Sequence, residues 1–88
     1  MLYEWDKPKR RNNLAKHGVD FPAIESFEWE EAVVAPDTRK QYGETRYTAI
    51  GPIGDRLHWV CFTLRGDSFR IISLRKANAR EVKKWLEK

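Results

Sequence analysis

Residues 45–75 read TRYTAIGPIGDRLHWVCFTLRGDSFRIISLR, and they carry the clearest architectural signal in the chain. Three runs rich in β-branched and aromatic residues predict strands at 45–53, 57–65 and 68–75. The breaks between these runs are short and contain glycine and other turn-forming residues, so we expect hairpin connections. The stretch therefore predicts an antiparallel meander.

The segment before the meander predicts two helices. The first spans residues 7–17, with Asp6 as its N-cap and Gly18 as a left-handed stop after its last turn. Asp20 can cap a second helix, whose first turn tolerates Pro22. Because the first helix has a single strongly apolar residue, it should bury little, and its charged face should serve something other than stability.

A fourth strand and a third helix complete the predicted elements. Residues 29–34 combine glutamates, which favour helix, with tryptophan and valines, which favour strand, and we interpret them as a strand closed by Pro36. Residues 78–88 predict a helix in which Asn78 and Glu81 form a capping box. The expected fold is therefore α+β, with two N-terminal helices, a four-stranded antiparallel sheet and a C-terminal helix.

Length and composition indicate one domain over residues 1–88, and 41% hydrophobic residues are enough for a small core. No run approaches the roughly 20 apolar residues that span a bilayer, and the N-terminus lacks the apolar segment of a signal peptide. The single cysteine, Cys61, lies in an apolar run, which predicts a buried and unreactive thiol. These features predict a cytoplasmic protein without a membrane partner.

The charge of the chain is uneven. Its net charge is +4, and an acidic block at residues 25–31 separates two basic blocks. This distribution indicates a polarised surface suited to an anionic polymer, although solvated basic helix faces explain it equally well. The cations that we expect to contact nucleic acid are Lys7, Arg10, Arg11, Lys16, Lys76 and Arg80.

The sequence has no motif for a metal or a cofactor, and we expect none. The two histidines, His17 and His58, are far apart, and there is neither a cysteine pair nor a glycine-rich phosphate loop. His58 shares a strand face with apolar residues, which favours a hydrogen-bonded core histidine. His17 ends the basic helix, where interaction with the last carbonyls is more common than catalysis.

Arginines on the predicted strands remain as candidates for chemistry. Arg46, Arg70 and Arg75 interrupt runs that otherwise favour burial, and Glu44 lies close to the first of them. A carboxylate base beside arginines that stabilise charged phosphorus suits metal-free cleavage of RNA through its 2′-OH. By strand alternation, Arg70 and Arg75 point to opposite faces unless a bulge intervenes. The aromatic residues that could stack on an unpaired base are Tyr42, Tyr47 and Phe69.

Three blocks of the chain resemble the BrnT toxin family. The first is Trp5-Asp6-x-x-Lys9-x-x-x-Asn13-Leu14-x-Lys16-His17-Gly18-Val19-x-Phe21. The second is Glu44-x-Arg46-Tyr47-x-x-Ile50-Gly51, and the third is Arg70-Ile71-Ile72-Ser73-x-Arg75-Lys76-Ala77, followed by Glu81. Together the blocks span nearly the whole chain in the order and spacing of that family, and their combination is far more specific than any one of them.

The resemblance implies a RelE-like fold and a type II toxin that arrests translation by cutting RNA, free or ribosome-bound. It also implies a heteromeric complex with a BrnA-like antitoxin, which carries a DNA-binding domain. The matching positions that we take as candidate catalytic residues are Lys9, His17, Glu44, Arg46, Arg70 and Arg75. Asn13 and His17 lie four residues apart on one helical face, so we expect them to dock the basic helix on the sheet.

Two other functions fit the same residues. One is a non-catalytic basic module that binds RNA or DNA with an affinity that falls steeply with salt. The other is a pure protein-interaction role, in which the basic face serves an acidic segment of the antitoxin. We favour a metal-independent endoribonuclease in which the basic helix positions RNA or an acidic partner and the sheet arginines carry the chemistry.

Overall fold

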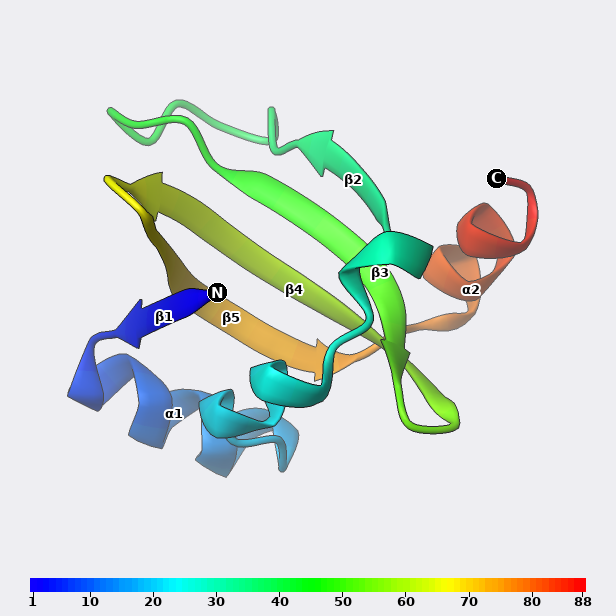
Figure 1. Ribbon diagram of the computed structural model, residues 1–88, viewed down its shortest axis with the longest axis horizontal. Coiled ribbons are helices and arrows are strands. Elements are labelled where there is room, and N and C mark those ends of the chain that lie inside the picture. Colours follow the sequence, from blue (N-terminus) through cyan, green and yellow to red (C-terminus); the bar gives the residue numbers. More distant parts are fainter.

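A five-stranded sheet forms the centre of the protein (Figure 1), in a computed structural model that describes all 88 residues. The strands lie in the order β1-β5-β4-β3-β2. Their bounds are β1 Leu2–Trp5, β2 Val33–Pro36, β3 Tyr47–Ile53, β4 Arg56–Arg65 and β5 Ser68–Lys76. The α-helices are α1 Lys7–His17 and α2 Ala79–Leu86, and the 3₁₀ helices are η1 Phe21–Ser26 and η2 Trp29–Glu31.

The predicted meander is confirmed, together with both ends of α1 and the N-terminal cap of α2; α2 ends at Leu86, two residues before the predicted end. β3, β4 and β5 pair antiparallel and are joined by the two short turns expected between them. In α1, the Lys9 N–H donates to Asp6 at 3.0 Å, and Gly18 ends the helix with a φ of 72°. In α2, Asn78 and Glu81 form the expected capping box. These features are local in sequence, which is why they were predictable.

The expected four-stranded antiparallel sheet is wrong, because the sheet has five strands and is mixed. β1 pairs parallel with β5, from Leu2 opposite Ser68 to Trp5 opposite Ile71. Four residues are too few to show a strand by alternation, and a parallel partner far along the chain leaves no turn signal. The RelE-like arrangement that we expected, with four strands and two N-terminal helices, is corrected accordingly.

The expected second N-terminal helix is not an α-helix. Asp20 caps it by accepting from the Phe21 N–H at 3.0 Å, but the segment is the 3₁₀ helix η1. Phe21 and Ile24 are buried, as is Phe27 at the C-cap, so the apolar residues recur every third position. A 3₁₀ helix has three residues per turn and aligns side chains of that spacing on one side. The apolar spacing therefore suits 3₁₀ geometry better than α geometry.

The strand expected at residues 29–34 is displaced. Its first half forms η2, and β2 begins only afterwards. The single 3₁₀ turn directs Trp29 into the core, where its ring packs edge-on against Phe62 with centroids 5.2 Å apart. Glu30 and Glu31 stay exposed. The mixed composition of this segment thus reflects one inward tryptophan beside two solvated carboxylates.

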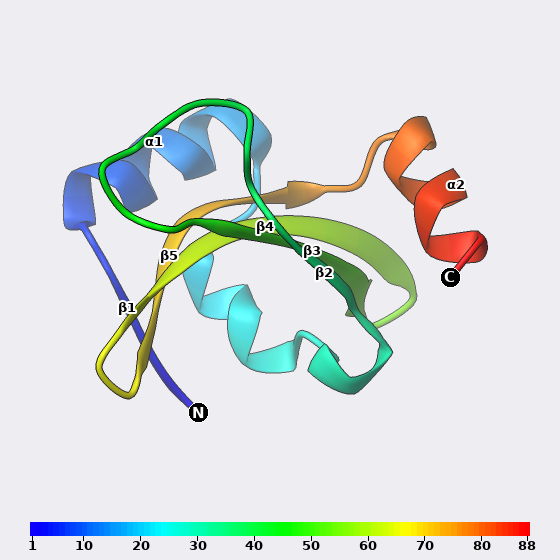
Figure 2. The ribbon, with the colours of Figure 1, turned by 90° about the horizontal axis from the view of Figure 1, so that it is seen from above.

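The two faces of the sheet are covered differently (Figure 2). η1 and η2 lie against one face, which we call the η face, whereas α1 and α2 lie on the other side. On that other side a region framed by α1, α2 and the loop at residues 37–46 is left without a helix, and we call it the open face. The side chains that β3, β4 and β5 direct to it are Thr48, Ile50, Trp59, Cys61, Thr63, Arg70, Ser73 and Arg75.

The main core lies on the η face. Its buried residues are Val19, Phe21, Ile24, Phe27, Ala49, Val60, Phe62, Ile71 and Leu74. A smaller cluster beneath α2 consists of Ile50, Trp59, Cys61 and Ala77. The only buried residue of α1 is Asn13, so the basic helix contributes little to either core, as its composition predicts. None of the helices has the length and apolar character that crossing a membrane requires.

Candidate active site

A β-bulge in β5 brings the candidate arginines to one face of the sheet. The pairing between β4 and β5 shifts at Cys61 and Phe62, which leaves Ile72 as an extra residue in β5. The extra residue reverses the alternation that follows it, so Arg75 points to the same face as Arg70. The bulge that strand alternation required, if Arg70 and Arg75 were to share a face, is therefore present.

The open face is organised in rows of side chains that run across the sheet. In one row Thr63 pairs with Arg70, and Arg70 pairs with Glu4 of β1. Arg46 joins this row from the residue that precedes β3. Arg75 lies two rows away, roughly 13 Å along the strands at about 3.3 Å per residue. Two of the three arginines therefore lie together, and the third lies near the opposite end of the face.

Each of these three arginines already contacts a carboxylate. The pairs are Arg46–Glu44 at 3.3 Å, Arg70–Glu4 at 3.2 Å and Arg75–Glu81 at 2.8 Å. A guanidinium has five N–H donors, so each arginine retains donors for a phosphate while the carboxylate holds it in place. The Glu44 carboxylate also contacts Arg65 at 3.5 Å, so it is shared between two cations and suits positioning better than proton transfer.

Asn13 docks α1 on β5. β1 pairs with β5 only as far as Ile71, and the Asn13 amide then takes the place of a strand. Its Nδ2 donates to the Leu74 carbonyl at 2.7 Å, and its Oδ1 accepts from the Leu74 N–H at 3.1 Å. Nδ2 also donates to the Val19 carbonyl at 3.0 Å, and the Ser73 hydroxyl donates to Oδ1 at 3.2 Å. The docking role expected of Asn13 is confirmed.

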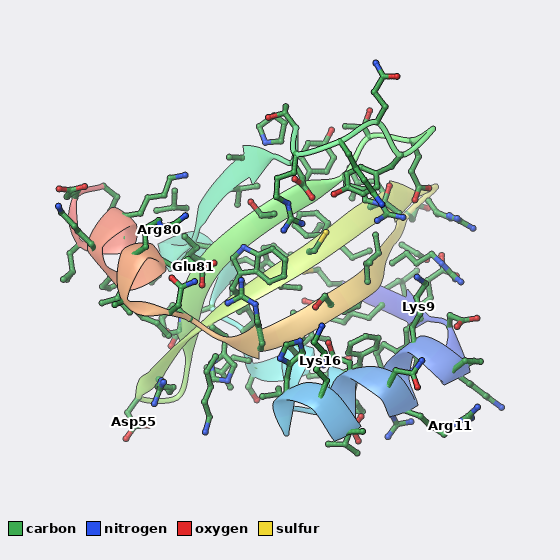
Figure 3. All side chains as sticks on the ribbon, turned by 180° about the vertical axis from the view of Figure 1, so that it is seen from behind. Lys9, Arg11, Lys16, Asp55, Arg80 and Glu81 are labelled. Atoms are coloured by element: carbon green, nitrogen blue, oxygen red, sulfur yellow. The ribbon has the colours of Figure 1, made fainter.

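Lys9, Lys16 and His17 lie on the side of α1 that faces the sheet. Together with Ser73 of β5 they line a groove of about 190 Å³. Figure 3 shows Lys9 and Lys16 on this side of the helix and Arg11 on the opposite side. Neither lysine forms an ion pair within the protein, so both charges are available to an anion.

The environment of His17 keeps its imidazole neutral at pH 7. Burial, together with the positive charges of Lys16 and Arg75, lowers the pKa of His17 from its usual value of 6.5. A neutral imidazole can accept a proton, which is the role of a general base. Arg75 lies two residues along β5 from Ser73, which lines the same groove as His17.

A chain of contacts holds Arg75 in place. The nearly fully buried Asp37 carboxylate accepts two hydrogen bonds of 2.8 Å from Arg39. The Arg39 guanidinium lies 5.4 Å from the ring centroid of Trp59, and the Arg75 guanidinium lies 4.2 Å from the same ring. Glu81 completes the chain with two hydrogen bonds of 2.8 Å from Arg75. Two carboxylates and one indole therefore orient the Arg75 guanidinium.

A cleft of about 390 Å³ lies between the loop after β2 and α2. Arg80 and Lys84 line it from successive turns of α2, and neither forms an ion pair. Figure 3 shows Arg80 and Glu81 on α2, across the open face from α1. The cleft adds a second set of unpaired cations to the lysines of α1.

Comparison with known protein families shows the class to which the chain belongs. The family described as "Ribonuclease toxin, BrnT, of type II toxin-antitoxin system" has a model that matches residues 5–81. The chain belongs to the BrnT family. BrnT proteins are ribonuclease toxins of type II toxin–antitoxin systems, so an RNA substrate and an antitoxin partner follow for this chain. Comparison with curated proteins finds none that matches.

The remaining predicted nucleic-acid contacts of this BrnT chain are spread over several sides. Of these cations, Lys16 and Arg80 border the open face. Arg10 is held by Asp20 through two hydrogen bonds of 2.8 and 2.9 Å. The exposed cations that point away from the open face are Lys7, Arg11 and Lys76.

Sequence reasoning missed Asp37 and Arg39 as parts of the BrnT site. Their segment was interpreted only as the turn that closes a strand. An aspartate two residues before an arginine is too common a pattern to signal an ion pair, and its burial depends on Cys61 and Trp59, which lie far along the chain. For Trp59 a signal was available in strand alternation. His58 shares a face with apolar core residues, so its neighbour Trp59 points to the opposite, open face.

Cys61 and His58 have the structural roles that the sequence predicts. Burial, reinforced by the nearby Asp37 carboxylate, raises the pKa of the Cys61 thiol, so the thiol stays protonated and unreactive. His58 is 7% exposed, and its Nδ1 lies 2.9 Å from the Arg56 carbonyl oxygen. Neither residue contributes chemistry to the BrnT open face.

The three aromatic residues expected to stack on a base are engaged in other contacts. Tyr47 and Phe69 pack against the core of the η face. The Tyr42 ring is covered by the Arg46 guanidinium at 4.0 Å, and its hydroxyl donates to Asp37 at 3.1 Å. Base stacking on the open face therefore has no support from these three side chains.

Acid should destabilise this BrnT chain through two carboxylates of the site. Arg39 holds the pKa of Asp37 well below its usual range. Burial raises the pKa of Glu81, but hydrogen bonds from Arg75 and from the Asn78 N–H outweigh it, and the net shift is downward. A carboxyl group whose pKa is lower in the folded state contributes stability above its unfolded pKa, near 4, and loses it as pH falls further. We therefore expect Tm to fall by several degrees between about pH 5 and about pH 3.

Circular dichroism melts test this dependence. In an Asp37→Asn variant one of the two titrating groups is absent, so Tm should decline less over the same interval. An equal decline in the wild type and the variant would assign the acid sensitivity to other carboxylates.

Proposed function

We propose that this BrnT chain is a metal-independent endoribonuclease that arrests translation by cutting RNA bound across its open face. His17 is the general base. Lys9 and Lys16 hold the scissile phosphate, and Arg75 stabilises the charge that develops on it. The observation that carries the proposal is the groove beside α1, which is lined by His17 and two unpaired lysines and borders β5, the strand on which Glu81 holds Arg75 in place.

The reaction is an attack of a ribose 2′-oxygen on the adjacent phosphorus. His17 accepts the proton of the 2′-hydroxyl, and the bond between phosphorus and the 5′-oxygen breaks. The 5′-oxygen leaves with a proton from Lys9, and the products are a 2′,3′-cyclic phosphate and a 5′-hydroxyl end. Arg75 and Lys16 donate to the phosphoryl oxygens, on which negative charge increases in the transition state.

Arg46 and Arg70 bind a neighbouring phosphate of the same RNA strand. They lie roughly 13 Å along the strands from Arg75, too far to share its phosphate. Glu44 and Glu4 position them, and their remaining N–H groups are free to donate. The open face therefore holds RNA at two points and cuts it near α1.

The donor set supports a reaction without metal. His17 and Lys9 line one groove and can supply a base and an acid, and Arg75 lies two residues along β5 from Ser73 of the same groove.

An assay in excess EDTA tests this proposal. The purified protein should cut RNA in EDTA and leave 2′,3′-cyclic phosphate ends, identified by mass spectrometry. Cleavage that EDTA abolishes and Mg²⁺ restores would contradict the metal-free mechanism. Salt-sensitive binding without cleavage in any condition would favour the non-catalytic module instead.

Translation arrest and its relief are tested in a cell-free translation reaction. Adding the toxin should stop protein synthesis as mRNA fragments accumulate, and a BrnA-like antitoxin should restore protein synthesis. We propose that the toxin acts in the same way in the cytoplasm. Comparing cleavage of free mRNA with cleavage of ribosome-bound mRNA shows which form is the substrate. Arrest without RNA fragments would contradict cleavage as the cause.

Replacing the three sheet arginines tests their role directly. The variant Arg46→Ala/Arg70→Ala/Arg75→Ala should cut RNA at least about 100-fold more slowly, because donors to the transition-state phosphate are worth about that much. Arg65→Ala is the matched control, since Arg65 also pairs with Glu44 but lies at the end of β4, roughly 20 Å along the strand from Trp59, the residue opposite Arg75. Its rate should change less than about twofold. Full activity in a folded triple variant would refute the assignment.

A further inference from the structure

An apolar groove on the η face is covered by no part of the chain. It has a volume of about 340 Å³, and all of its lining residues are hydrophobic: Trp29, Val34, Tyr47, Phe62, Leu64 and Phe69. Val34 is 49% exposed and Leu64 is 51% exposed. Single exposed apolar residues are ordinary on protein surfaces, but a contiguous apolar groove marks an interaction site.

The floor of the groove is rigid before any partner binds. Phe62 stacks on Phe69 with ring centroids 5.3 Å apart and on Tyr47 at 5.6 Å. Trp29 packs edge-on against Phe69 at 5.1 Å, and its indole N–H donates to the Tyr3 hydroxyl at 2.6 Å. A preformed surface loses little conformational entropy on binding, so apolar side chains of a partner can be buried there at low cost.

The charge around the groove is negative, although the chain as a whole is positive. Glu28 and Glu30 flank Trp29 in sequence, and both are exposed and form no ion pair. Glu25 lies near Tyr3, where its charge adds to burial in raising the pKa of the Tyr3 hydroxyl. Nucleic acid is repelled by such a rim, whereas a peptide with Lys or Arg beside its apolar residues is attracted.

The groove also borders a free sheet edge. β2 is the last strand of the sheet, so the backbone groups on its outer side have no partner strand, and Val34 of this strand lines the groove. A segment that inserts apolar side chains into the groove can therefore also reach unpaired backbone donors and acceptors.

We infer that this groove is the docking site of the antitoxin, which binds it through a segment with two or three apolar anchors flanked by basic residues. The inference rests on family membership and not on the proposed RNA chemistry, which occupies the opposite face of the sheet. The toxin thus offers a basic face to RNA and an apolar, acid-rimmed face to protein.

Titration calorimetry with the antitoxin encoded beside the toxin gene tests this docking site. The variant Val34→Glu/Leu64→Glu adds two carboxylates to the groove and should weaken antitoxin binding at least 100-fold, while RNA cleavage stays within about twofold of the wild type. The matched control is Leu14→Glu, because Leu14 is a leucine of similar exposure, 44%, that lies on α1. Its antitoxin affinity should not change.

Hydrogen exchange on the unmodified toxin gives an independent readout if the double variant folds poorly. Antitoxin binding should protect amides at residues 33–36 and 62–69. Protection confined to α1 and the open face, or equal losses of affinity in the double variant and in Leu14→Glu, would overturn the inference. A third outcome would also overturn the inference: the toxin forms a dimer, Val34→Glu/Leu64→Glu dissociates that dimer, and antitoxin affinity is unchanged. The groove would then belong to a second copy of the chain.

Discussion

Replacing His17 by alanine should lower kcat for RNA cleavage roughly 100- to 1,000-fold and change KM little, because a positioned general base contributes about that much to a proton transfer. The substitution removes the proton acceptor and leaves Lys9, Lys16 and Arg75 to bind the phosphate.

The pH profile of cleavage gives a second readout. Only neutral His17 accepts a proton, and its pKa is lowered from the usual 6.5. Wild-type cleavage should therefore fall as the pH drops below this lowered pKa. The variant should lack this acid limb.

The second histidine provides a matched control. His58 is buried, and its Nδ1–H donates locally to the Arg56 carbonyl, away from the groove beside α1. His58→Gln should therefore lower Tm but leave cleavage per folded molecule and the acid limb unchanged. Equal losses of kcat in the two variants would mean that His17 acts through stability and not as a base.

Replacing Asn13 by alanine should destabilise the fold by about 2–4 kcal/mol, measured by urea denaturation. The loss is large for one small side chain because the N–H and the carbonyl of Leu74, together with the Val19 carbonyl, lose their partner in a buried place. Cleavage should also fall, since Asn13 holds α1 against β5 and α1 carries Lys9 and His17.

The neighbouring Asn12 is the matched control for Asn13. It is the same residue type on the same helix, but it is exposed and makes no hydrogen bond through its side chain. Asn12→Ala should therefore change the free energy of unfolding by less than about 0.5 kcal/mol. A similar loss in both variants would show that helix propensity, and not the docking amide, sets the stability.

Features that depend on nearby residues could be predicted from the sequence. The ends of α1 and α2 follow from their caps, and the meander follows from alternating runs separated by short turns. β1 could not be predicted in the same way, because its pairing with β5 depends on residues at the far end of the chain. η1 was predicted at the right place but with the wrong geometry, since the threefold spacing of Phe21, Ile24 and Phe27 was not used to separate 3₁₀ from α helix.

The candidate site shows the same division. Arg46, Arg70 and Arg75 could be nominated from their position in apolar runs, but placing them on one face required the bulge at Ile72, which no residue type announces. The partner carboxylate of Arg70 comes from Glu4, on the strand that was not recognised. Ion pairs between distant residues are a product of topology, so they could be assigned only once the sheet order was known.

The pairing of the first strand with the last has a consequence for the time at which the toxin becomes harmful. β1 and α1 leave the ribosome early, but both need β5 to take their places. β1 needs β5 as its hydrogen-bonding partner strand, and α1 needs the Leu74 backbone that Asn13 binds. Until residue 76 has been synthesised and has emerged, α1 with His17 cannot dock on the strand that carries Arg75. In the mechanism that we propose, a nascent chain therefore becomes active only after residue 76 has left the exit tunnel.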